Sequence, residues 1–222
     1  VRLPGAAGEH ISTPAHPDFY SSNKKGVIVC VAMDNWAAAS PAQFFMSQIN
    51  TAANRRTFFF GQTVSGRVYA GLYQTGNSSP VALFNSNVNI ADAAGVSDGE
   101  KLWLGVSLDD DNGSVAEGKF WWSLDGESWT IHGNPTTTAI GGSYDNTVDP
   151  LVIGADSTGT TSLMKGAVYR AQLFDGIGAN TAPGQGTLVA EWIAEEAGTR
   201  YTDQTGKLWT IQGSSWATTN DE

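Results

Sequence analysis

Residues 101–124 read KLWLGVSLDDDNGSVAEGKFWWSL and predict two antiparallel strands joined by a hairpin turn. In the first strand the even positions are uniformly apolar, namely Leu102, Leu104, Val106 and Leu108. The odd positions are Trp103, Gly105 and Ser107, and alternation points the two sets to opposite faces. Asn112-Gly113 is the strongest short hairpin signal. The stretch therefore predicts a sheet with one buried face and a tryptophan on the other.

Two registers of this hairpin stay open. A strict two-residue turn pairs residue 103 with 122 and places Phe120 and Trp122 on the Trp103 face. One bulge slips the register and places Trp121 there instead. Either register leaves Trp103 and at least one further tryptophan on the face opposite the leucines.

Residues 66–74 repeat the arrangement. Alternation puts three apolar residues on one side, namely Val68, Ala70 and Leu72. It puts Arg67, Tyr69 and Tyr73 on the other side. A second strand thus also predicts an aromatic outer face.

Across the chain, 26 glycines and 8 prolines separate short apolar stretches with strand-like alternation, and helix signals are nearly absent. Strands are predicted over 26–33, 42–49, 56–62, 66–74, 80–85, 101–108, 117–124, 128–132, 150–155, 165–175, 187–193 and 207–212. About a dozen strands predict an all-β, two-sheet antiparallel β-sandwich or jelly roll rather than a small barrel. No stretch resembles an interdomain linker, the loosest being Gly176–Gly186, so residues 1–222 are predicted to form one domain.

The composition excludes several classes of protein. With 222 residues, 41% hydrophobic and 15% charged, the chain can bury a substantial core. Its net charge of -10 repels phosphate backbones and anionic bilayers, so nucleic acid is not an expected partner. Neither a membrane span nor a signal peptide is expected, and because the chain begins at Val1 it is expected to be processed or cut from a longer protein.

Two further motifs have a possible chemical role, but the sequence favours a structural role for both. Cys30 lies inside an apolar run and is predicted to be a small buried hydrophobe rather than a reactive thiol. Asp109 and Asp111 imitate the first half of a calcium loop, but Phe120 occupies the position where such a loop needs a bidentate Glu. A hairpin turn is predicted there, with calcium as the weaker alternative and no other cofactor.

The segment from Ser123 to Trp129 resembles the Asp-box hairpin of sialidase-like proteins, with one residue fewer between Asp125 and Gly126. It predicts a structural turn. Residues 206–213 echo residues 126–133, which predicts the same passage from turn to strand a second time.

Hydrolysis of a glycoside needs two carboxylates across a sugar cleft. The candidates are Glu191, Glu195 and Glu196 near the C-terminus, and Asp145 and Asp149 around one loop. Neither group forms the Glu-x-Asp-x-x-Glu run that laminarinase-type jelly-roll hydrolases carry on one strand. The chain is therefore predicted not to be an enzyme.

An aromatic second face has two explanations. Another sheet, a loop or a neighbouring subunit can cover it, or it can bind sugar, since pyranose C–H faces stack on Trp and Tyr rings. The eight tryptophans favour sugar. The predicted platform comprises Trp103, Trp121, Tyr69, Tyr73 and Arg67, with Trp36 and Tyr144 at its rim.

Several motifs, taken in order, resemble the concanavalin A-like jelly roll. They are Ser12-Thr13-Pro14, residues 32–36, 102–106, 111–113 and 120–129, and Ile153-Gly154-Ala155. The ending, with residues 166–171, Asp175-Gly176-Ile177 and residues 203–211, is similar to the lectin-like domains of minor tail proteins of phages infecting actinobacteria. The resemblance covers about residues 10–217.

This resemblance implies a sandwich with a concave face, in a virion protein that contacts the host surface. Expected partners are host-surface carbohydrate and other virion proteins, in a homo- or hetero-oligomeric assembly at the particle surface. The first hypothesis is a non-enzymatic attachment module. The alternatives are a purely structural or decoration protein whose aromatic face packs on neighbouring subunits, and an extracellular β-glucan hydrolase.

Overall fold

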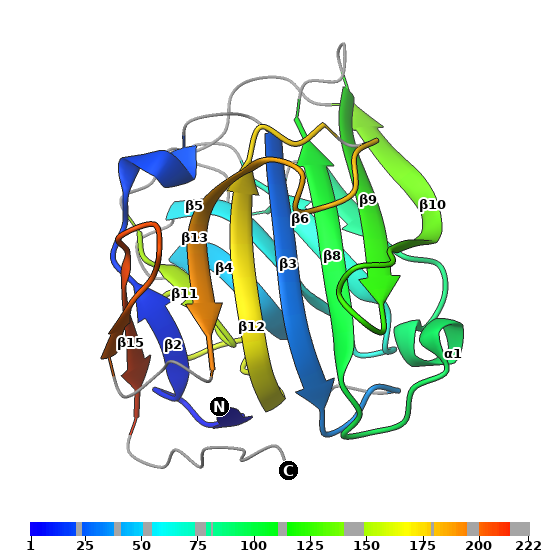
Figure 1. Ribbon diagram of the computed structural model, residues 1–222. Helices are drawn as coiled ribbons and strands as arrows, with labels where there is room; N and C mark the ends of the chain where they lie inside the picture. The colour runs from blue at the N-terminus through cyan, green and yellow to red at the C-terminus, as the bar shows by residue number, and fades with distance from the viewer. Residues whose placement is uncertain are drawn as a thin grey trace.

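Two antiparallel sheets pack face to face in the computed structural model (Figure 1). The structure describes residues 1–20, 24–37, 41–50, 55–73, 79–80, 82–110, 115–139, 149–178, 180–194 and 200–213. This arrangement confirms the predicted all-β sandwich. No helix in these ranges is long and apolar enough to cross a membrane.

The sheet at the front of Figure 1, sheet A, has the strand order β1-β12-β3-β8-β9-β10, and β13 also pairs with β12. Its strands are β1 (Arg2–Pro4), β3 (Lys24–Met33), β8 (Leu102–Asp109), β9 (Val115–Ser123), β10 (Thr130–Ala139), β12 (Lys165–Asp175) and β13 (Thr187–Ile193).

The sheet behind it, sheet B, has the order β14-β15-β2-β11-β4-β5-β6-β7. Its strands are β2 (His10–Thr13), β4 (Gln43–Asn50), β5 (Arg55–Gln62), β6 (Val68–Leu72), β7 (Ala82–Asn85), β11 (Leu151–Ile153), β14 (Arg200–Thr202) and β15 (Leu208–Gln212). Two short helices complete the described elements, η1 (Pro17–Tyr20) and α1 (Ile90–Ala94).

The hydrophobic core lies between the inner faces of the two sheets. Leu104 and Val106 from β8 and Phe58 and Phe60 from β5 are fully buried in it. The apolar side of residues 102–108 therefore faces inward, as the alternation predicts. The opposite sides of both sheets are left as outer faces, and these decide where a ligand can bind.

The hairpin of β8 and β9 adopts the slipped register. Trp103 pairs with Ser123 and Gly105 pairs with Trp121. Trp121 therefore shares the outer face with Trp103, while Phe120 is buried in the core. Packing of Phe120 between the sheets fixes this register, because a slip of one residue would turn it outward.

Each predicted strand overlaps an observed one, but the sequence did not indicate β1, β2, β14 or α1. These elements have three to five residues, too few for alternation or helical periodicity to be recognised. Long-range pairing creates the short strands, since β2 lies between β11 and β15 in the middle of sheet B.

Candidate ligand site

Two surface segments cover the outer face of sheet A. Residues 176–178 and 180–186 belong to a segment that leaves β12, crosses in front of β3 and β8, and returns to β13 (Figure 1). Residues 124–129 connect β9 to β10. Between the two segments lies a pocket of about 430 Å³. Its lining comprises Ile28, Gly126, Glu127, Trp129, Gln172, Phe174, Ala182, Pro183, Gly184 and Gln185.

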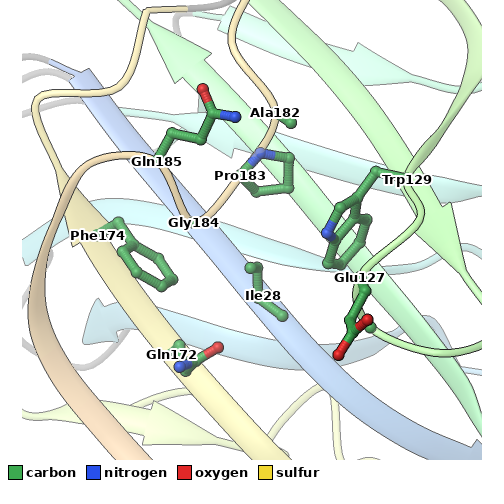
Figure 2. A pocket seen from close by; sticks show the side chains of 10 residues that line it. Ile28, Glu127, Trp129, Gln172, Phe174, Ala182, Pro183, Gly184 and Gln185 are labelled. Carbon is green, nitrogen blue, oxygen red and sulfur yellow. The ribbon is translucent and has the colours of Figure 1, made fainter.

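Two apolar side chains of the sheet lie at the pocket. Ile28 of β3 and Phe174 of β12 are 5% and 7% exposed, and they form an outer cluster with Ile177. Trp103, Trp129 and Leu188 pack against this cluster and are partly buried. Figure 2 shows Trp129 on the wall opposite Phe174, with Ile28 between them. The site therefore offers an indole ring beside an apolar surface.

The turn that carries Glu127 and Trp129 is held by one carboxylate. Asp125 accepts hydrogen bonds from the backbone N–H of Ser128 at 2.7 Å and of Glu127 at 2.8 Å, and from the Ser123 hydroxyl at 2.7 Å. These hydrogen bonds stabilise the ionised carboxylate and hold the pKa of Asp125 well below its usual range. The bond from Ser128 has the largest effect. Gly126 takes a left-handed φ of 80° in this turn. The predicted structural turn thus also fixes one wall of the pocket.

The opposite wall is fixed to the sheet beneath it. Pro183 lies directly on Gly105, where a Cβ atom would be 2.4 Å from the proline Cγ. The Ser107 hydroxyl donates to the carbonyl of Thr181 at 2.7 Å, and Trp121 Nε1 donates to that hydroxyl at 3.2 Å. The missing side chain at Gly105 lets the segment approach closely enough to form a wall.

Gln172 contributes a polar group whose orientation is determined by its neighbour. Its Nε2 donates to Glu191 Oε1 at 2.7 Å, and Arg170 Nε donates to the same oxygen at 2.8 Å. A carboxylate accepts hydrogen bonds, so the amide nitrogen of Gln172, and not its carbonyl oxygen, faces Glu191. The carbonyl oxygen of Gln172 is then directed to the side of Glu127, as Figure 2 shows.

Trp103 and Trp121 lie on this outer face, as predicted, but neither lines the pocket. Trp103 packs under the turn, where a Cβ atom on Gly126 would be 2.8 Å from its ring. Trp121 is 8% exposed and lies beneath residues 180–183. Both tryptophans therefore support the walls of the site, and Trp129 is the described tryptophan that lines it.

The prediction that Tyr69 and Tyr73 share a platform with Trp103 is wrong. Both tyrosines pack in a cluster with Phe44, Ile49 and Phe59 on the outer face of sheet B. The outer faces of a two-sheet sandwich point in opposite directions. Arg67 is exposed just before β6 and does not line the pocket either.

The predicted position of Trp36 at a binding rim is also wrong. Its side chain is 1% exposed in the core between the sheets. Its backbone N–H donates to Asp98 at 2.7 Å, and its carbonyl accepts from Gln62 Nε2 at 2.5 Å. Tyr144, the other rim candidate, lies outside the described residues, as do Asp111, Asp145, Glu195 and Glu196.

The described acidic candidates have structural partners. Glu191 is 1% exposed and, besides Arg170 and Gln172, accepts from Gln204 Nε2. Asp149 is 1% exposed and accepts from Asn50 at 2.9 Å. Asp109 forms an ion pair with Lys24 at 3.2 Å. Among the described residues no group of three or more metal-ligating side chains is present.

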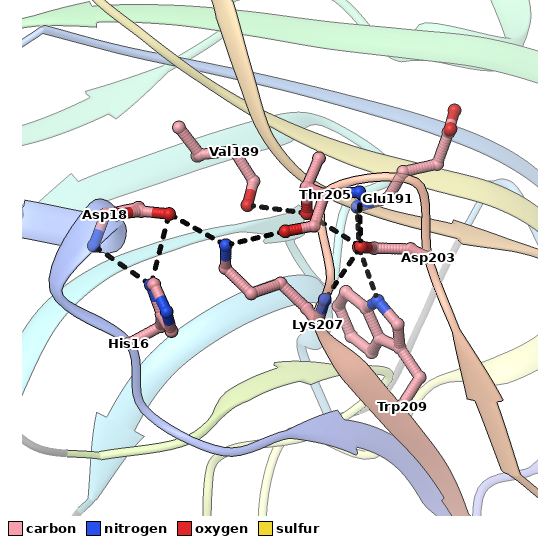
Figure 3. Close-up of polar contacts among 8 residues, drawn as sticks. All are labelled: His16, Asp18, Val189, Glu191, Asp203, Thr205, Lys207 and Trp209. Atoms are coloured by element: carbon pink, nitrogen blue, oxygen red, sulfur yellow. Dashed lines mark hydrogen bonds and ion pairs between the residues drawn. The ribbon is translucent and has the colours of Figure 1, made fainter.

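The echo of the turn near the C-terminus has its own carboxylate. Asp203 accepts from the backbone of Glu191 at 2.7 Å, from Lys207 N at 2.9 Å and from Trp209 Nε1 at 3.1 Å (Figure 3). Glu191 belongs to sheet A and Trp209 to sheet B. This network therefore joins the sheets at one end of the sandwich.

Sequence reasoning missed the residues that line the pocket. Its two walls were nevertheless both visible in the sequence, as the turn ending at Trp129 and as the loose segment 176–186. What the sequence did not show is that these segments, about fifty residues apart, approach each other across one sheet. Gln172 and Phe174 gave no signal beyond their place in a predicted strand.

Fold and site together define a jelly-roll β-sandwich with a small aromatic pocket on one outer face. No protein-family model matches the chain, and neither does any curated protein. Among solved structures, it is similar to the CBM40 of Ruminococcus gnavus IT-sialidase bound to α2,3-sialyllactose. That match has 12% identity and a TM-score of 0.50 and covers 80% of this chain and 95% of the other.

A second match is the native heptameric SAP-like pentraxin from Limulus polyphemus, at 13% identity and a TM-score of 0.49, covering 95% of this chain and 93% of that one. Of these two matches, the Ruminococcus gnavus structure supports the fold, because its TM-score reaches 0.50. At 12% identity it supports the fold alone.

Proposed function

We propose that this chain is a non-enzymatic carbohydrate-binding module and that the pocket beside Trp129 holds the sugar. The observation that carries the proposal is the combination of the partly buried indole of Trp129 with an apolar surface and the oriented carbonyl of Gln172. A pyranose needs a ring for its C–H face and polar groups for its hydroxyls. The Ruminococcus gnavus neighbour was solved with sialyllactose, which is consistent with glycan binding on this fold.

The pocket favours binding over hydrolysis. Glu127 is the one carboxylate among the lining residues that the structure describes, whereas glycoside hydrolysis uses a pair. Glu191, which pairs with Gln172 across β12 and β13, is buried and engaged by three side chains. The described geometry offers no second carboxylate to the pocket.

We further propose that the module acts in attachment of a phage particle to host-surface glycan. The support is the resemblance of residues 166–171, 175–177 and 203–211 to lectin-like domains of phage minor tail proteins. In this role the chain lies at the surface of the virion and belongs to an oligomeric assembly with other virion proteins.

The decisive experiment is a glycan panel read by intrinsic tryptophan fluorescence and calorimetry, with and without calcium. Trp129→Ala should weaken binding at least about tenfold, because it removes the stacking ring. Tyr69→Ala is the matched control, since it removes a partly buried ring from the other outer face. Unchanged affinity in Trp129→Ala, with the fold retained by circular dichroism, would refute the site.

A further inference from the structure

We infer that the pocket selects neutral and amino-bearing pyranosides over anionic ones. This inference rests on the proposed function and adds the chemical class of the sugar. It follows from the charges at the pocket and from the orientation of the Gln172 amide.

Charge at the pocket is negative. Glu127 is the single ionisable residue among the ten that line it, and it is exposed. Among the described residues of the lining there is no Lys, Arg or His. Asp125 lies in the same turn and stays ionised, because backbone and hydroxyl donors hold its pKa low. A sugar carboxylate would meet like charge here, whereas an ammonium group would be attracted.

Arg170, two residues before Gln172 on β12, is already paired with a carboxylate. Arg170 directs its Nε and Nη2 to Glu191 Oε1, and Glu191 is 2% exposed at its side chain. Withdrawing Arg170 would leave a buried carboxylate without its cation, which is costly. The guanidinium therefore stays with Glu191 and is withheld from an anionic ligand.

The same carboxylate sets the polarity of Gln172. Since Glu191 takes the amide N–H, the carbonyl oxygen is the atom presented on the side of Glu127. A carbonyl and a carboxylate both accept hydrogen bonds. Hydroxyl and ammonium groups can donate to them, but a sugar carboxylate cannot.

The fold neighbour makes this inference specific. The Ruminococcus gnavus structure holds α2,3-sialyllactose, an acidic sugar. The ten described lining residues provide no cation to pair with such an acid. We therefore expect this pocket to discriminate against sialyllactose despite the shared architecture.

The test uses matched ligands that differ in one group. Methyl glycosides of glucose, galactose and mannose are titrated beside their 2-amino and 6-carboxylate derivatives and α2,3-sialyllactose, by NMR and fluorescence. For the parent sugar that binds, the amino form should bind about two- to fivefold more tightly and the carboxylate form about two- to fivefold more weakly, as befits an exposed charge. Added salt should reduce both differences.

Glu127→Gln should bring the amino and carboxylate derivatives closer in affinity. Asp92→Asn is the matched control, because it removes one exposed negative charge on α1, away from the lining residues, and should leave the ratio unchanged. Binding of a carboxylate derivative or of sialyllactose as tightly as the parent, and lost in Trp129→Ala, would overturn the selectivity and leave the site intact. Binding by none of these sugars, or binding that Trp129→Ala does not change, would overturn the proposed function and this inference with it.

Discussion

The outer faces of the two sheets carry aromatic clusters of similar composition that pack differently. On sheet B, the rings of Phe44 and Phe59 stack with centroids 4.8 Å apart at 21°, and Phe59 and Tyr69 also lie 4.8 Å apart. On sheet A, Phe174 and Trp129 border a pocket of about 430 Å³. One cluster fills its own space and the other leaves room for a ligand.

The difference comes from the segments above the sheets. Residues 124–129 and 180–186 stand over the cluster of sheet A and hold Trp129 to one side of it. On sheet B the described rings contact one another directly, and Arg56 lies 5.7 Å from the ring of Tyr73. Aromatic residues on a second face thus identify a surface, whereas the connecting segments determine whether their rings meet each other or a ligand.

The largest effect should separate stability from binding. Phe59→Ala removes the ring that the sheet B cluster shares, because Phe59 contacts Phe44, Tyr69 and Tyr73. We expect a loss of about 3 kcal/mol in the free energy of unfolding, measured by urea titration, with glycan affinity unchanged. Weaker glycan binding in this variant would show that the two faces do not act separately.

Two glycines, one on each sheet, allow the two outer faces to be compared through substitutions with an intermediate loss of stability. A Cβ atom at Gly71 would be 2.3 Å from Phe59 Cε1, and one at Gly105 would be 2.4 Å from Pro183 Cγ. Each Gly→Ala change should cost about 1–3 kcal/mol of stability through overpacking. Only Gly105→Ala should also weaken glycan binding, because it displaces a pocket wall. Equal affinities in the two variants would count against the role of Pro183.

The smallest effect concerns alkaline pH. Burial raises the pKa of Tyr69, with the nearby Tyr73 adding to the shift, and burial also raises the pKa of Tyr73. A phenol with a raised folded-state pKa contributes stability that is present below its ordinary pKa of about 10 and is lost as the pH rises through the folded value. Phenolate absorbance should therefore appear at higher pH in the folded protein than in the protein unfolded in urea. Tyr69→Phe should make this difference in pH smaller.

The sequence predicted the sandwich because alternation is a local property. Leu102 to Leu108 and Val68 to Leu72 show their buried side without any knowledge of their partners. The sheet to which each strand belongs is not local, and for that reason Tyr69 was wrongly grouped with Trp103. The pocket escaped prediction for a similar reason, since Glu127 and Gln185 line the same pocket only because β12 pairs with β3, β3 with β8 and β8 with β9.

Trp36 shows a different limit. It was predicted at the rim of a binding platform and follows the polar Asp34 and Asn35, yet its indole is 1% exposed. A tryptophan in a polar turn can point either way, and only the space between the sheets decides.

The way the pocket walls are attached has a consequence for diversification. Both walls lie on the outside of sheet A and are held by a few contacts. Asp125 holds one wall through its hydrogen bonds, and Ser107 and Gly105 hold the other. The interior layer, with Leu104, Val106 and Phe58, makes no part of the lining. If the pocket binds as proposed, exchange of the two surface segments would change ligand preference while the scaffold stays the same, so this sandwich is a suitable frame for grafting new specificities.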